Sequence, residues 1–179
     1  PVSRKVKITQ AVGPLVYEID HQPATAFYQE YLGPLSISGE YPLAVFEPES
    51  DRFYLRASNQ WDLDRGTVLF MGDVPEQATV QISHATSDNL IHSTHTAIQQ
   101  AQANYPGHQP SAVLIFSCAA RRWTLGSRIQ EEYAISQQLL APPMPLIGFY
   151  SYGEISPLSP GGAPRYHQET LVTVLLGME

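Results

Sequence analysis

The chain has 179 residues, a formal net charge of −7 and a single cysteine. The negative charge argues against nucleic acid as a partner, because proteins that bind a phosphate backbone carry basic surfaces. No apolar run reaches the ~18 residues that are needed to span a bilayer, so we expect no membrane partner. One cysteine cannot form an internal disulfide, and this fits a reducing, cytoplasmic compartment. The first residue is Pro1 rather than Met, so we expect the segment to be excised from a longer chain.

The first half of the chain is predicted to be rich in short strands. A loosely alternating segment over 4–10 is expected to be an edge strand, a second strand follows over 15–20, and a helix covers 24–32. Turn-rich links then separate four runs of strand-forming residues, at 43–46, 53–57, 67–71 and 79–82. Short strands joined in this way favour an antiparallel meander.

The second half alternates helices and strands. We expect helices over 87–105 and from about Ser127 to 140, and strands over 112–117, 146–155 and 171–176. Residues 117–123 are expected to form a polar, cationic turn, and 156–165 an irregular loop rich in Pro, Gly and Ser. The strand–helix–strand order predicts parallel pairing of the first two strands, with the last strand returning antiparallel. The fold class is therefore α+β: a mixed sheet with a meander, a C-terminal βαβ unit plus a returning strand, and three helices packed on it.

This topology predicts that polar groups gather at one edge of the sheet. The expected set combines a thiol, two cations, a carboxylate, an imidazole, a hydroxyl and two phenols, namely Cys118, Arg121, Arg122, Glu154, His167, Thr170, Tyr150 and Tyr152. Mixed charges beside aromatic rings suit a zwitterion such as an amino acid, with arginine binding its carboxylate and glutamate its ammonium group. We therefore predict a small-ligand site at this edge.

Glu132 falls inside the apolar stripe of the predicted helix that follows this edge. A carboxylate in that position is costly unless it is paired. One interpretation is a surface ion pair with Arg128, four residues earlier. The alternative is that Glu132 reaches Arg121 or Arg122 and holds a ligand-binding guanidinium in place.

Three histidines raise the question of a metal site. His92 and His95 lie within the predicted helix over 87–105, and His84 precedes it. His92 falls opposite the apolar stripe, and no carboxylate or thiol joins the histidines at ligand spacing. We expect solvent-facing histidines, no metal and no cofactor.

Three segments carry a family resemblance: Ser117–Cys118–Ala119–Ala120–Arg121, the run from Gly148 to Ile155, which reads GFYSYGEI, and His167 followed by Thr170. Together with Glu132 they resemble the C-terminal half of the FIST domain, and the similarity covers nearly the whole chain. The family commonly has asparagine after the histidine, where this chain has Gln168. The resemblance implies a single FIST C-like domain over 1–179 from a multidomain signalling protein. It also implies a cytoplasmic sensory module that binds a small ligand, with the FIST N-terminal half and an output domain as partners.

Two other functions compete with this non-enzymatic interpretation. Cys118 lies near two arginines and could act with His167 as base in a cysteine hydrolase or amidotransferase. A small buried apolar cysteine is the commoner situation, so catalysis is not expected. The other alternative is a structural half-domain whose polar edge packs on the FIST N-terminal half.

Overall fold

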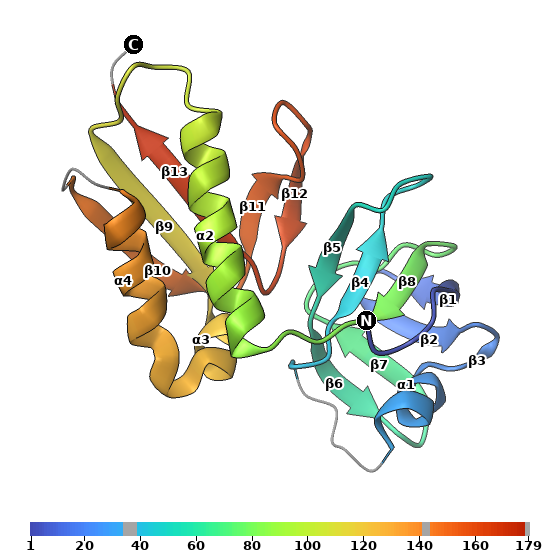
Figure 1. Cartoon of the computed structure of the whole chain (residues 1–179). Helices are drawn as coiled ribbons and strands as arrows, with labels where there is room; N and C mark the ends of the chain where they lie inside the picture. The colour runs from blue at the N-terminus through green and yellow to red at the C-terminus, as the bar shows by residue number, and fades with distance from the viewer. Residues whose placement is uncertain (34–38, 141–143, 178–179) are drawn as a thin grey trace. The chain divides into compact units, whose positions relative to one another are not determined.

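The computed structural model describes residues 1–33, 39–140 and 144–177 (Figure 1). The chain divides into two compact units. The first contains Pro1–His84 and Tyr166–Gln168, and the second contains Ala85–Arg165 and Glu169–Glu179. The chain therefore passes from one unit to the other more than once.

The first unit is built on an antiparallel sheet with one helix. Its described strands are β1 (Val6–Val12), β2 (Leu15–Ile19), β3 (Gln22–Pro23), β4 (Leu43–Phe46), β5 (Phe53–Arg56), β6 (Ser58–Asp62), β7 (Thr67–Phe70) and β8 (Thr79–Ile82), and its helix is α1 (Ala24–Leu32). Their order is β5-β4-β8-β1-β2-β7-β6, with β3 added on β2. The antiparallel arrangement was predicted, whereas β6 was not. The edge position expected for β1 was wrong, because β1 pairs with both β8 and β2.

The core of this unit forms where the sheet meets α1. Phe27 and Tyr28 of the helix are fully buried, as are Ile8, Val16 and Ile19 of the strands. Tyr28 also meets Trp61 of β6 edge to face, with ring centroids 4.8 Å apart. Burial of aromatic side chains of this size contributes strongly to the stability of a small unit.

Residues from far along the sequence complete the first unit. The guanidinium of Arg56 donates from Nε to the carbonyl of Asp73 (2.9 Å) and from Nη1 to the carbonyl of Tyr166 (3.0 Å). The side-chain oxygen of Gln168, which is 1% exposed, accepts a hydrogen bond of 2.8 Å from the backbone N–H of Ala57. Gln168 therefore satisfies a buried backbone donor of the first unit.

The second unit contains a three-stranded sheet of order β10-β9-β13, made of β9 (Ala112–Cys118), β10 (Leu146–Ser151) and β13 (Leu171–Leu176). β10 is parallel to β9, with Tyr150 beside Ser117, and β13 is antiparallel to β9, with Leu171 beside Ser117. Both orientations were predicted. The C-terminal ends of β9 and β10 and the start of β13 therefore meet at one end of this sheet.

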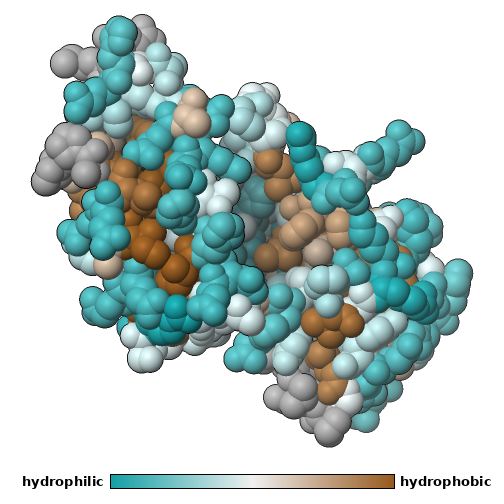
Figure 2. Space-filling view, in the orientation of Figure 1, coloured by the Kyte–Doolittle hydropathy of each residue, from teal (hydrophilic) through white to brown (hydrophobic). Residues whose placement is uncertain are grey.

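Helices pack on one face of this sheet. They are α2 (Ser87–Ala103), the short α3 (Ala119–Leu125) and α4 (Ile129–Leu139), with a 3-10 turn at Gly126–Arg128. Ile98 of α2, Val113 of β9 and Leu140 after α4 form a buried cluster. Figure 2 shows apolar surface among the polar side chains on the side of this unit that carries α2 and α4.

Several predictions for this region were wrong. The polar turn expected over 117–123 is largely the helix α3, and α4 begins at Ile129, after Arg128, which makes no side-chain cap. The predicted strand over 146–155 is interrupted after Ser151 and resumes as β11 (Glu154–Pro157). β11 pairs with β12 (Pro164–His167), so the segment expected to be irregular contains a two-stranded sheet.

Gly148 permits the close approach of β10 to β9. A Cβ at this position would meet the backbone carbonyl of Ile115, which cannot move without disturbing the sheet. We expect Gly148→Ala to destabilise the second unit by about 1–3 kcal/mol, the usual cost of overpacking. Hydrogen exchange of the β9 and β10 amides measures this loss directly.

Gly161 provides a control without a steric clash, because a Cβ there would meet nothing within 4 Å. Its φ of +72° makes an alanine strained, but that strain lies in the link between β11 and β12, outside β9 and β10. Gly161→Ala is expected to leave exchange in β9 and β10 at the wild-type rate. Equal protection of these strands in wild type and Gly148→Ala would contradict the steric explanation.

Candidate functional site

A buried ion pair lies near the C-terminal end of β9. Arg121 of α3 donates from Nη2 to Oε1 of Glu132 in α4 at 2.6 Å, and the two side chains are 3% and 8% exposed. Ser117 of β9 donates to the other carboxylate oxygen, Oε2, at 3.2 Å. Of the two interpretations that the sequence left open for Glu132, pairing with Arg121 or Arg122 is confirmed, and the partner is Arg121.

Helix α2 supplies the remaining partners of this pair. Arg121 donates to the carbonyl of Leu90 (3.0 Å), to Oγ of Ser93 (3.0 Å) and to Oγ1 of Thr94 (2.8 Å). Thr94 Oγ1 also lies 3.0 Å from Glu132 Oε1. Both terminal nitrogens of the guanidinium therefore have protein partners, and Arg121 acts as a brace between α2, α3 and α4 rather than as a free anion receptor.

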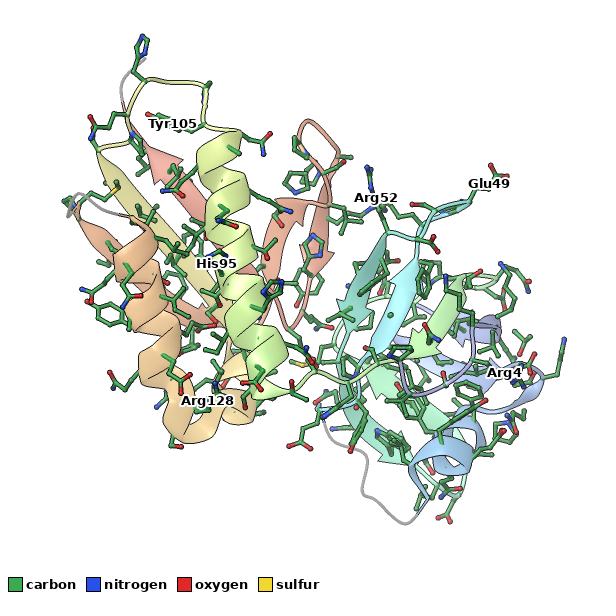
Figure 3. All side chains as sticks on the ribbon, viewed as in Figure 1. Arg4, Glu49, Arg52, His95, Tyr105 and Arg128 are labelled. Carbon is green, nitrogen blue, oxygen red and sulfur yellow. The ribbon has the colours of Figure 1, made fainter. Side chains whose placement is uncertain are left out.

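The alternative pairing of Glu132 with Arg128 was wrong. Arg128, labelled in Figure 3, donates to Glu131 at 2.8 and 2.7 Å and to Asp88 at 2.6 Å. These hydrogen bonds raise the pKa of Arg128 and lower that of Glu131. The exposed ion pair thus links the start of α4 to the start of α2, apart from the buried pair.

Glu154 is also engaged by neighbouring side chains. It is 4% exposed, and its Oε1 and Oε2 accept hydrogen bonds from Ser151 (2.6 Å) and Thr170 (2.8 Å). Burial raises its pKa, and the two hydroxyl groups oppose that shift. The predicted convergence of Thr170 and Glu154 is therefore present, with the carboxylate joining β11 to the start of β13.

Cys118 and Glu169 lie at the same end of the sheet. Burial raises the pKa of the Cys118 thiol, and the Cys118 backbone N–H donates to the Thr170 carbonyl at 2.9 Å. Glu169 has a left-handed φ of 60°, and burial raises its pKa to about 8. These environments keep both groups protonated at neutral pH, so neither supplies an activated nucleophile.

Tyr152 and His167 differ from the other members of the predicted set. Tyr152 is 70% exposed in the turn after β10, so the expected alternation with Glu154 is broken. His167 is buried and belongs to the first unit, whereas Cys118 belongs to the second. Neither unit therefore contains a Cys118–His167 pair within itself.

A groove of about 550 Å³ lies between α4 and β10 in the second unit. Its lining is mostly apolar, with a few polar groups, and comprises Ile115, Ser117, Ile129, Gln130, Glu132, Tyr133, Ser136, Leu146, Ile147, Gly148, Phe149 and Tyr150. The sequence prediction included only Glu132 and Tyr150 of these. A mostly apolar concavity with few polar groups is the usual form of a small-ligand site.

A cation lies beside one of the residues that line this groove. The guanidinium of Arg122, an exposed residue, lies 5.5 Å from the centroid of the Tyr150 ring. Partial burial raises the pKa of the Tyr150 hydroxyl, which therefore remains a neutral hydrogen-bonding group at physiological pH. Arg122 and Tyr150 thus present positive charge and a phenol side by side.

The described part of the chain contains no cluster of three or more histidine, cysteine or acidic side chains that could hold a metal ion. His95, labelled on α2 in Figure 3, therefore belongs to no such cluster among those residues. Among the same residues, no helix combines the length and apolarity that crossing a membrane requires.

Comparison with known proteins gives one family match. The model of the FIST C domain matches residues 24–157, a range with residues from both units. The match ends before His167 and Thr170. No curated protein and no solved structure matches the chain.

Removing Arg121 should expose the cost of the buried carboxylate. We expect Arg121→Met to destabilise the second unit by about 3–5 kcal/mol, because the carboxyl group of Glu132 would be left buried without its partner. The double variant Arg121→Met/Glu132→Met should recover much of this loss, since no uncompensated charge remains. Chemical unfolding curves measure all three forms.

Arg128→Met serves as the control for the loss of an arginine from an ion pair. Because Arg128 is exposed, its removal should cost far less than that of Arg121. Equal losses for the two single variants would show that burial does not determine the importance of the Arg121–Glu132 pair.

The Cys118 thiol should resist alkylation at neutral pH. Its pKa is raised by burial, so the thiolate fraction lies below that of an ordinary cysteine at pH 7–8 and rises only at more alkaline pH. Iodoacetamide labelling followed by intact-mass measurement between pH 6 and 10 tests this, with the urea-unfolded chain as reference. Faster labelling of the folded chain than of the unfolded chain at pH 7 would contradict it.

Proposed function

Because the chain belongs to the FIST C domain family, which is associated with sensory signal transduction, we propose that it is a sensory module that binds a small ligand in the groove between α4 and β10. The observation that carries this proposal is an apolar groove of ligand size with an exposed guanidinium beside Tyr150, one of its lining residues. The ligand class is a small carboxylate with an apolar body, such as an amino acid.

We assign to Arg122 the binding of the ligand carboxylate, a role that the sequence analysis gave equally to Arg121 and Arg122. The guanidinium of Arg121 is buried and donates to four groups of the protein, whereas that of Arg122 is exposed beside Tyr150. A carboxylate at Arg122 would direct the apolar part of the ligand along Phe149 and Ile147. Glu132 also lines the groove and offers its Oε2, which accepts one 3.2 Å hydrogen bond from Ser117, to a ligand ammonium group.

The buried ion pair gives ligand binding a route to the rest of the unit. Glu132 lines the groove and is bonded to Arg121, which in turn holds Leu90, Ser93 and Thr94 of α2. A ligand that displaces α4 would therefore change the contacts of α2 and α3 as well. We propose that this displacement is relayed in the cytoplasm to the FIST N-terminal half and to an output domain, without catalysis.

A cysteine-dependent reaction finds less support in the chemistry of the site. The Cys118 pKa is raised rather than lowered, and the groove lining does not include Cys118. We therefore propose binding as the function and do not assign Cys118 a catalytic role.

Isothermal titration calorimetry with apolar amino acids tests the proposal. We expect Arg122→Gln to weaken binding of leucine or phenylalanine at least tenfold, because the charge-assisted bond to the carboxylate is lost. Arg65→Gln is the matched control, since this exposed arginine lies in the first unit. Absence of heat with every apolar amino acid and apolar peptide, while circular dichroism shows a folded chain, would exclude the proposed site.

A further inference from the structure

We propose that the ligand of the groove is a short extended peptide. The peptide adds a strand to the open edge of β10 and places its C-terminal carboxylate at Arg122. This inference rests on the proposed function and specifies the ligand class of the same site. It combines an unpaired strand edge, an apolar groove that reaches that edge, and a cation beside one of the residues that line the groove.

The outer edge of β10 has no strand partner in the part of the chain that the structure describes. β10 is paired there with β9 alone, and the carbonyl of Pro145 accepts a 2.9 Å hydrogen bond from Val113 of β9. Backbone groups of successive residues in a strand point to opposite sides. The N–H and C=O groups of Leu146, Gly148 and Tyr150 are therefore directed away from β9, toward the open edge.

The groove extends from the helix-covered face of the sheet, where Ile115 and Ser117 of β9 line it, to this edge. Consecutive residues of a strand present their side chains on opposite faces, yet all five residues of the run 146–150 line the groove. A ligand in the groove consequently meets the outward backbone groups of β10.

β10 lacks the features that normally protect an edge strand. Its sequence, LIGFYS, contains no charged residue and no proline. Ile147 and Phe149 are 68% and 64% exposed, which leaves large apolar side chains beside the unpaired backbone. A strand of this kind is suited to pairing with another extended segment.

The opposite wall of the groove is the helix α4. Ile129, Tyr133 and Ser136 lie there at helical spacing and face the groove across from β10. In strand addition to a sheet edge, main-chain hydrogen bonds supply affinity and flanking pockets select alternate side chains. The apolar residues of α4 and β10 thus favour a peptide with apolar side chains.

Arg122 determines the orientation of the peptide. It lies against Tyr150, near the C-terminal end of β10. Only a peptide that runs parallel to β10 brings its C-terminal carboxylate to that end. The chemistry therefore fits a free peptide terminus rather than an internal segment of a longer chain.

Calorimetry with trileucine tests the inference through its two amide N–H groups. In an extended strand these point to opposite sides, so we expect N-methylation of one amide to weaken binding at least tenfold and N-methylation of the other to leave it within about twofold. Free leucine should bind at least tenfold more weakly than trileucine. Equal affinities for both methylated peptides and the parent, or for free leucine and trileucine, would overturn the inference.

Trileucine amide and Arg122→Gln locate the carboxylate. Wild type should bind the free acid at least tenfold more tightly than the amide, whereas Arg122→Gln should bind the two equally. An unchanged preference for the acid in Arg122→Gln would place the terminus elsewhere and refute the proposed orientation. If leucine binds through Arg122 and the peptides bind no more tightly, strand addition fails while the proposed amino-acid site stands.

Discussion

The second unit depends on one buried contact, the ion pair between Arg121 and Glu132. Two opposite charges removed from water are costly, and they are tolerated because hydroxyl and carbonyl groups of α2 and β9 add hydrogen bonds to both carboxylate oxygens and both terminal guanidinium nitrogens, although the buried Nε of Arg121 has no partner among the described residues. Since α3, α4, α2 and β9 all contribute, the pair fixes how the helices lie on the three-stranded sheet. The same network explains why a charged residue occupies the inner stripe of α4.

Because Arg121 is paired with Glu132 and bonded to α2, its guanidinium is not free to bind a ligand carboxylate. The same holds for Glu154, whose two oxygens are occupied by Ser151 and Thr170. Charged residues that sequence analysis gathers at a sheet edge can therefore form the structure of that edge rather than its recognition surface. The groove beside β10 differs, since its apolar residues and the nearby Arg122 remain accessible.

The sequence predicted the parts of the fold that are encoded by long apolar runs. The apolar segments of β9, β10 and β13 identified three strands, and the order of strands and helices along the chain predicted which of them run parallel. The expectation that Glu132 is paired followed from the cost of burying a lone carboxylate. The sequence prediction failed where polar residues form regular structure, as in α3, where the polar sequence resembled a turn because the partners that allow Arg121 to be buried lie on other helices. The groove was not predicted because it arises from the distance between α4 and β10 in the folded chain. A distance between two packed elements produces no periodic pattern in the amino-acid sequence.

The assignment of Tyr166–Gln168 to the first unit has a consequence for dissecting the molecule. The chain enters the second unit after His84, returns for three residues and leaves again at Glu169. A fragment truncated after position 84 would lack the carbonyl of Tyr166, which accepts a hydrogen bond from Arg56. It would also lack the side-chain amide of Gln168, which accepts one from the backbone N–H of Ala57. Neither unit is thus an autonomous segment of sequence, and limited proteolysis within β12 should loosen both at once.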